Sequence, residues 1–181
     1  MSDSKIGKSK ETHGVSETEK YLTFSLGDEQ YGLDILRVRE IIGLMDITKV
    51  PRTPQFIRGV INLRGKVIPV IDLRKKFEME SVDDTDQTCI IVADIERESS
   101  TLQMGIIVDS VSEVLDIEKD NIDEAPTFGA DISTTFIKGI AKTKGGVKIL
   151  LNIEEVLTAV ELQSISTVSY QNSRNEKDAV E

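Results

Sequence analysis

Few side chains in this 181-residue chain are of the types that perform catalysis. The single histidine, His13, lies in a polar N-terminal segment, which offers no partners for a catalytic triad or a histidine metal site. The single cysteine, Cys89, opens an apolar run (CIIVA), which is typical of a buried, inert thiol rather than an activated nucleophile. Neither residue therefore indicates an enzyme.

Two other patterns resemble ligand sites but lack a residue that the chemistry requires. The segment 7–9 (GKS) is similar to the end of a phosphate-binding loop, but Ser2 stands where that loop needs its first glycine. The acidic segments 83–86 and 116–121 lack the glycine at the sixth position of a calcium-binding loop. We interpret them as solvated loop charge and expect no metal ion and no cofactor.

The composition is that of a globular protein with an apolar core, because 39% of the residues are hydrophobic and 30% are charged. The formal net charge of −10 would repel a phosphate backbone, so we expect no nucleic acid partner. One cysteine cannot form an internal disulfide, and no apolar run approaches the ~18 residues of a membrane helix. The N-terminus also lacks the apolar region of a signal peptide, so the sequence predicts a cytoplasmic protein.

The charge is unevenly distributed along the chain. Residues 37–77 carry ten basic and three acidic side chains, whereas residues 78–124 carry fifteen acidic and two basic ones. These segments form either two solvated faces or complementary patches that steer head-to-tail contacts with protein partners.

The apolar residues mostly alternate or form short runs, which predicts β-structure. Three hairpins are indicated, at 21–35, 60–71 and 89–108, each with a polar or glycine-containing turn. The segment 33–42 is predicted to be a strand with a bulge near Leu36. Asp72 and Asn152 are predicted to cap two short helices, 73–77 and 153–162.

The chain contains an internal repeat. The segment at 56–60 (FIRGV) matches that at 136–140 (FIKGI) at an offset of 80, and the same offset aligns 64–73 with 144–153. At an offset of 73, Gly32, Val38 and Glu40 match Gly105, Val111 and Glu113. Two copies of a small β unit with such short strands predict two small closed barrels.

The domain organisation follows from this repeat and from the polar ends of the chain. Residues 1–19 and 163–181 are predicted to be disordered tails. The structured region is then 20–162, an all-β domain with minor helix, in which the second subdomain spans roughly 88–150.

Three segments resemble the CheW family of bacterial chemotaxis coupling proteins. They are residues 24–41 (FSLGDEQYGLDILRVREI), 53–74 (TPQFIRGVINLRGKVIPVIDLR) and 105–115 (GIIVDSVSEVL). The resemblance covers about residues 20–162 and implies two intertwined five-stranded SH3-like β-barrels with a short C-terminal helix. The regulatory domain of CheA and the coupling half of CheV share these features. The chain carries neither a kinase core nor a receiver domain, which favours a free-standing member.

The resemblance implies a non-catalytic scaffold that links transmembrane chemoreceptors to the histidine kinase CheA, so that receptor state controls kinase activity. Such a protein is cytoplasmic, lies with receptor clusters at the inner face of the membrane, and meets the membrane only through the receptors. Its partners are the regulatory domain of CheA and the cytoplasmic hairpin tip of methyl-accepting receptors.

The receptor tip is expected to dock in a groove between the barrels, and the resemblance points to Val38, Gly59, Val111 and Val114 there. Three polar residues are also assigned to this groove: Glu40, Asn62 and Arg64. Ordinary core packing is the alternative for the valines. Because burying a lone charge is costly, Glu40 and Arg64 are predicted to form a salt bridge on the groove side, the alternative being two solvated charges.

Kinase contact is expected at the barrel ends. Phe128 is the candidate anchor there, unless it is tucked under its own loop. Two other classes of function compete with the adaptor. A small-molecule or enzymatic barrel would need convergent polar groups around a pocket, and a nucleic-acid binder would need stacking aromatics among residues 37–77. The sequence favours the adaptor over both.

Overall fold

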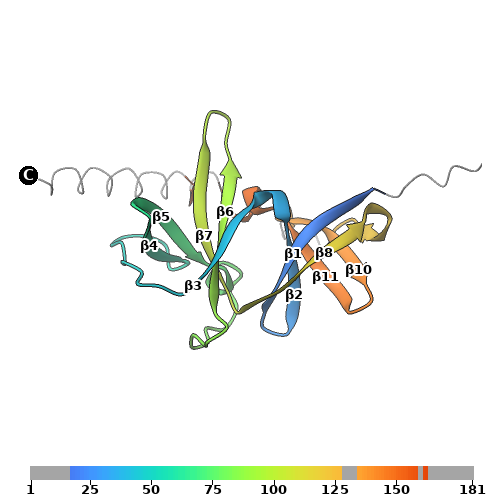
Figure 1. The fold of residues 1–181 in the computed structure, drawn as a ribbon, viewed down its shortest axis with the longest axis horizontal. Helices are drawn as coiled ribbons and strands as arrows, with labels where there is room; N and C mark the ends of the chain where they lie inside the picture. The colour runs from blue at the N-terminus through green and yellow to red at the C-terminus, as the bar shows by residue number, and fades with distance from the viewer. Residues whose placement is uncertain (1–16, 128–133, 159–160, 163–181) are drawn as a thin grey trace, which may run out of the picture.

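The structure is a computed structural model that describes residues 17–127, 134–158 and 161–162. Within these residues eleven strands form two sheets, with short helical segments at three connections and another after the last strand (Figure 1). The elements are β1 (Thr18–Leu26), β2 (Glu29–Asp34), η1 (Ile35–Arg37), β3 (Val38–Gly43), β4 (Ile57–Leu63), β5 (Lys66–Asp72), α1 (Leu73–Lys76), β6 (Cys89–Glu96), β7 (Thr101–Val108), β8 (Ser110–Glu118), η2 (Lys119–Asn121), β9 (Ile122–Asp123), β10 (Ile137–Thr143), β11 (Gly146–Leu151) and α2 (Ile153–Val156).

The two sequence repeats exchange strands. The five-stranded sheet, barrel 1, has the order β3-β6-β7-β5-β4, so β6 and β7 of the second repeat lie among strands of the first. The six-stranded sheet, barrel 2, has the order β8-β1-β2-β11-β10-β9, so β1 and β2 lie among strands of the second. The layouts correspond strand for strand. The predicted all-β fold of two intertwined barrels is confirmed, with the two-residue β9 as an extra strand in barrel 2.

Each barrel closes because the chain leaving one edge strand returns beside the other edge. In barrel 1, the segment after β3 forms a two-residue bridge to β4, in which the backbone N and O atoms of Thr48 and Val60 are 2.9 Å apart in both directions. In barrel 2, β8 leads through η2 into β9, which pairs with β10. Closure gives the edge backbone groups hydrogen-bond partners.

The largest apolar cluster is shared by both barrels. Leu22 and Phe24 from β1 pack there with Ile71 from β5 and Ile91 from β6, together with Ile153 from α2. Smaller clusters fill the outer part of each barrel. The two barrels are therefore one folding unit with a common core.

Several local predictions are confirmed. The three predicted hairpins are β1–β2, β4–β5 and β6–β7. Asp72 caps α1, where its carboxylate accepts a hydrogen bond from the Lys75 backbone N–H at 3.3 Å. Asn152 occupies the N-cap of α2, but its side chain makes no capping hydrogen bond, and α2 ends at Val156 instead of continuing to the predicted end at 162.

Three boundary predictions are corrected. The second barrel does not coincide with residues 88–150, because β6 and β7 pair with β3 and β5. The segment 33–42 contains the end of β2 and most of β3, which lie in different sheets and are joined by η1, where the Asp34 carboxylate accepts a hydrogen bond from the Leu36 backbone N–H. The expected tail 1–19 ends early, since β1 begins at Thr18 and pairs there with β8. The tail 163–181 lies outside the described residues.

Within the described part of the chain, no helix is long and apolar enough to cross a membrane.

A charged clamp joins the barrels at the connection from β7 to β8. Asp109 receives two hydrogen bonds from the Arg74 guanidinium, at 2.7 and 2.5 Å, and one from the Gly27 backbone N–H at 2.8 Å. Arg74 belongs to barrel 1 through α1, whereas Gly27 lies in the β1–β2 turn of barrel 2. The hydrogen bonds from Arg74, and secondarily the one from Gly27, hold the pKa of Asp109 below its ordinary value.

Replacing Asp109 tests this clamp. We expect Asp109→Asn to lower the free energy of unfolding at neutral pH by roughly 1–3 kcal/mol, because it removes a charge-assisted pair that is mostly buried. The carboxylate has a lower pKa folded than unfolded. Its contribution is therefore complete above the unfolded pKa of about 4 and is lost as the pH falls through the folded pKa.

Urea denaturation from pH 7 to pH 3 measures the effect. The difference in stability between wild type and Asp109→Asn should become smaller toward the acidic end. Asp28→Asn removes an exposed carboxylate next to Gly27 and should leave stability nearly unchanged. A gap that stays constant over this pH range would contradict the assignment.

Candidate functional site

The predicted site residues lie mostly on the strands that begin where the chain crosses between barrels. β3 begins directly after η1, and β8 begins directly after Asp109. The two strands are equivalent in the repeat, and both are edge strands of their sheets. Equivalent side chains at the start of β3 and of β8 therefore lie at the junction of the two barrels.

Val38 and Val111 occupy equivalent places on these strands. Val38 pairs with Ala93 of β6, and Val111 pairs with Phe24 of β1. Both valines are half-buried and pack against the shared core. Most of the surface of each valine is therefore in contact with the core, as the alternative interpretation expected, and only part of each side chain faces solvent.

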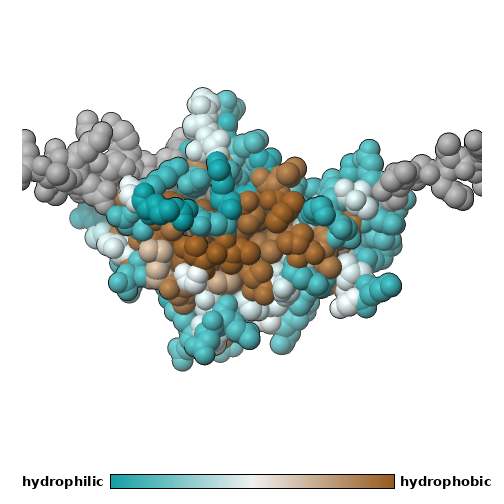
Figure 2. Space-filling view, in the orientation of Figure 1, coloured by the Kyte–Doolittle hydropathy of each residue, from teal (hydrophilic) through white to brown (hydrophobic). Residues whose placement is uncertain are grey.

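The solvent side of this junction is apolar. The described residues contain six exposed large hydrophobic side chains, and four of them lie on β8, on β3 or beside it. These four, the central apolar surface, are Leu36, Ile41, Met45 and Val114. Val114 is 49% exposed and Leu36 is 85% exposed. Figure 2 shows a continuous hydrophobic area across the middle of the face on which β3 and β8 lie in Figure 1.

Sequence reasoning identified Val114 but missed the other three residues of this surface. The alternation of β3 contained the signal for Ile41, because neighbours in a strand point to opposite faces. Val38, Glu40 and Ile42 are the less exposed set, so Ile41 faces solvent. Leu36 was obscured by the prediction of a continuous strand.

The predicted Glu40–Arg64 salt bridge is confirmed. Arg64 Nη2 contacts Glu40 Oε1, and Arg64 Nη1 lies 3.3 Å from Glu40 Oε2. Glu40 lies on β3 and Arg64 follows β4, so the pair joins the two edge strands of barrel 1. The Arg64 side chain is 72% exposed, and its hydrogen bond to Glu40 raises the pKa of the guanidinium. The ion pair therefore links the two edge strands of barrel 1 at the solvent-exposed surface.

Arg64 lies in the turn between β4 and β5. Arg64 and Gly65 have φ values of 53° and 84°, and they connect the paired residues Leu63 and Lys66. Two positive φ values in a two-residue loop are typical of a type I′ hairpin turn. Asn62 serves this turn, because its Oδ1 accepts the Gly65 backbone N–H at 2.8 Å.

Gly59 is buried and permits barrel closure. Its φ is +145°, and an added Cβ would lie 2.1 Å from the carbonyl oxygen of Thr48, the residue that bridges to β4. Gly139, its repeat equivalent, lacks the positive φ but lies equally close to the closing segment of barrel 2, with the added Cβ 2.9 Å from the carbonyl oxygen of Asp123. Gly59 therefore influences the central apolar surface only by allowing barrel 1 to close. Phe128, the predicted kinase anchor, lies outside the described residues.

The chemistry available at this face is that of protein binding. It combines exposed apolar side chains with one exposed ion pair, and such patches mark docking surfaces. Cys89 is half-buried at the end of β6, and burial raises the pKa of its thiol.

Comparison with known proteins identifies the family. Residues 20–161 match the CheW-like domain. The chain is 37% identical to chemotaxis protein CheW of Klebsiella aerogenes over 156 residues, which are 86% of this chain and 92% of that protein. It is 33% identical to CheW of Thermotoga maritima over 139 residues, or 77% and 87% of the two chains.

A solved structure agrees. The crystal structure of the scaffolding protein TtCheW from Thermoanaerobacter tengcongensis has a TM-score of 0.70 and 39% identity, and the match covers 80% of this chain and 96% of that one. The chain therefore belongs to the CheW family, whose members are non-catalytic scaffold proteins of bacterial chemotaxis.

Substitution of Gly59 tests the closure role. We expect Gly59→Ala to lower the free energy of unfolding by roughly 2–4 kcal/mol, because a side chain there adds backbone strain and overlaps Thr48. Gly43→Ala is the matched control on β3, since an added Cβ meets nothing within 4 Å. Urea denaturation measures the free energy of unfolding of both variants. Equal stability of Gly59→Ala and Gly43→Ala would contradict the assignment.

A double-mutant cycle tests the ion pair. We expect Glu40→Gln and Arg64→Gln to show favourable coupling in thermal stability at low salt. Because the pair is exposed, the coupling should weaken as salt is added. Additive effects at low salt would mean that the contact does not stabilise the barrel.

Proposed function

We propose that this chain couples transmembrane chemoreceptors to the histidine kinase CheA, so that receptor state controls kinase activity. Membership of the CheW family supports the coupling role. The observation that carries it for this chain is the central apolar surface, which lies at the junction of the barrels and has no described segment covering it.

The receptor's helical hairpin tip is the proposed occupant of this surface. An apolar face of a helix fits a hydrophobic strip, and the exposed side of Val114 would contact it directly. Val38 and Val111 would present their solvent-facing edges. The other predicted residues contribute indirectly, because they hold β3, β4 and the β4–β5 turn in place. These residues are Gly59, Asn62 and the Glu40–Arg64 pair.

The regulatory domain of CheA is the proposed second partner, at the barrel ends. It resembles this domain, so the two can alternate head to tail, and such heterologous contacts close into rings where the rotation permits. Phe128 remains a predicted anchor for this contact. The proposed location is the cytoplasm, in receptor clusters at the inner face of the membrane.

Substitution at the central apolar surface tests the proposal. We expect Val114→Asp to weaken co-sedimentation with a receptor cytoplasmic fragment by about tenfold or more, because a desolvated apolar contact would acquire a charge. Val147→Asp makes the same change on β11 at a side chain of similar exposure, 58%, and should bind normally.

The assay uses wild type and both variants with CheA and the receptor fragment, with circular dichroism to establish folding. Loss of receptor binding in a folded Val114→Asp protein, with Val147→Asp unaffected, would support docking at β8. Equal binding of the receptor fragment by both variants would mean that the receptor docks at a surface other than β8. A folded wild type that bound neither CheA nor receptor at micromolar concentrations would refute the coupling role.

A further inference from the structure

The outer part of barrel 2 is hollow where the same part of barrel 1 is filled. In barrel 1, the β4–β5 hairpin places Ile61 opposite Ile68, and both side chains are fully buried. The equivalent cross-strand pair in barrel 2 is Ala141 and Lys148 on β10 and β11. Thr143 likewise stands where barrel 1 has Leu63. These three replacements remove apolar volume and introduce a charge.

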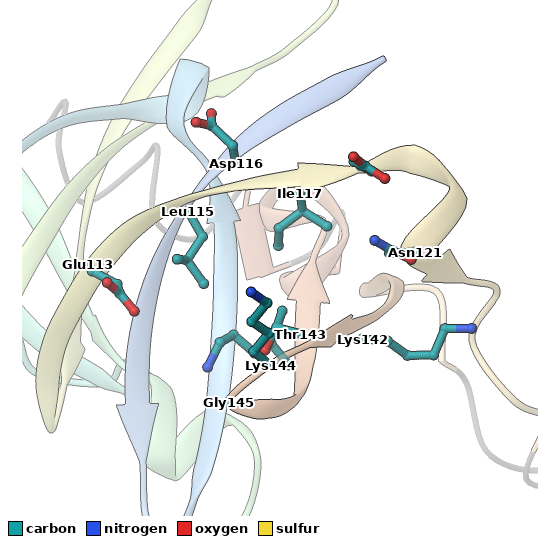
Figure 3. A pocket seen from close by; sticks show the side chains of 11 residues that line it. Glu113, Leu115, Asp116, Ile117, Asn121, Lys142, Thr143, Lys144 and Gly145 are labelled. Carbon is teal, nitrogen blue, oxygen red and sulfur yellow. The ribbon is translucent and has the colours of Figure 1, made fainter. Parts of the chain in front are cut away.

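A pocket of about 670 Å³ results between β8 and the β10–β11 hairpin (Figure 3). Leu115 and Ile117 point from β8 toward the hairpin, whereas Asp116 points away. The pocket is lined by Glu113, Leu115, Asp116, Ile117, Glu118, Asn121, Lys142, Thr143, Lys144, Gly145 and Lys148. It therefore has an apolar wall on β8 and a cationic wall on the hairpin.

Lys148 is the most unusual residue of this pocket. Its side chain is only 6% exposed, and its ammonium donates a hydrogen bond to Gln30 Oε1. Within the described residues Lys148 forms no ion pair, so the charge is buried beside a neutral amide. An ammonium has three donors, and burial without a counter-charge is costly. An anionic group in the pocket would supply that counter-charge.

The other charges of the pocket restrict the ligand further. Lys142 pairs with Asp123 at 3.3 Å, and Asp116 pairs with Lys20 at 2.9 Å. Lys144 has no ion pair among the described residues and would add a second cation. Glu113 and Glu118 are exposed at the rim, where their charges oppose polyanions. A single negative charge with an apolar body matches this arrangement.

We propose that barrel 2 binds a small organic monocarboxylate, with its carboxylate at Lys148 and Lys144 and its apolar part against Leu115 and Ile117. The pocket lies on the hairpin side of β8, and the proposal does not depend on the coupling function. The mechanism of recognition is a charge-assisted hydrogen bond in a largely desolvated place, combined with burial of the ligand's hydrocarbon portion.

The probe is hexanoate, titrated into the full-length protein and followed by ¹H–¹⁵N NMR. We expect saturable shifts confined to the amides of residues 113–118 and 141–148. Hexylamine, with the opposite charge, should cause none. Lys148→Met keeps the length of the side chain without its charge and should weaken binding by about tenfold or more. Lys66→Met removes an exposed lysine of the corresponding hairpin in barrel 1 and should change nothing.

A second variant separates loss of charge from loss of fold. Thr143→Leu places the residue found at the equivalent position in barrel 1, Leu63, in the lining of the pocket, so it reduces the pocket volume while retaining Lys148. It should also abolish the hexanoate shifts, and thermal melting shows whether the variant remains folded. Hexanoate shifts that persist unchanged in Lys148→Met would overturn the proposal. So would binding of inorganic phosphate in place of hexanoate, or no shifts in the wild type at millimolar concentrations.

Discussion

Two parallel strand pairs, β5·β7 and β2·β11, make the two barrels inseparable. Each pair joins a strand of one repeat to a strand of the other, so neither barrel can be completed by one repeat alone. A glycine stands at the same place in both pairs, Gly105 opposite Val70 and Gly32 opposite Leu150. An added Cβ at Gly32 would lie 2.7 Å from a Leu150 methyl group, so glycine at this position allows Leu150 to pack directly against β2.

The strand exchange also decides where the central apolar surface lies. Because the chain must pass between barrels twice, β3 and β8 begin at the junction and present their outer sides together there. The Arg74–Asp109 pair holds the second of these passages in place. A protein that docks on this face would contact both repeats at once, which suits a scaffold whose parts must keep a fixed relative orientation.

The two barrels share a layout but have diverged at their rims. Barrel 1 is packed with Ile61 and Ile68 and is closed by an exposed ion pair between its edge strands. Barrel 2 carries Ala141 and Lys148 at the same places and retains an open pocket. Duplication thus supplies two copies of one frame, in which one copy can keep the packing while the other acquires polar groups.

Local features were predictable from the sequence because neighbouring residues determine them. Alternating apolar residues with turn residues between them predicted the three hairpins, Asp72 predicted the start of α1, and the repeat predicted two similar barrels. The Glu40–Arg64 contact was also predicted, from the cost of burying a lone charge, although the structure places Arg64 in a solvent-exposed turn. Only the tertiary structure decided which strands pair, because exchanged and unexchanged barrels satisfy the same alternation. It also decided that Gly59 lies at a closure and that Lys148 is buried, because both facts depend on segments distant in sequence that pack beside them.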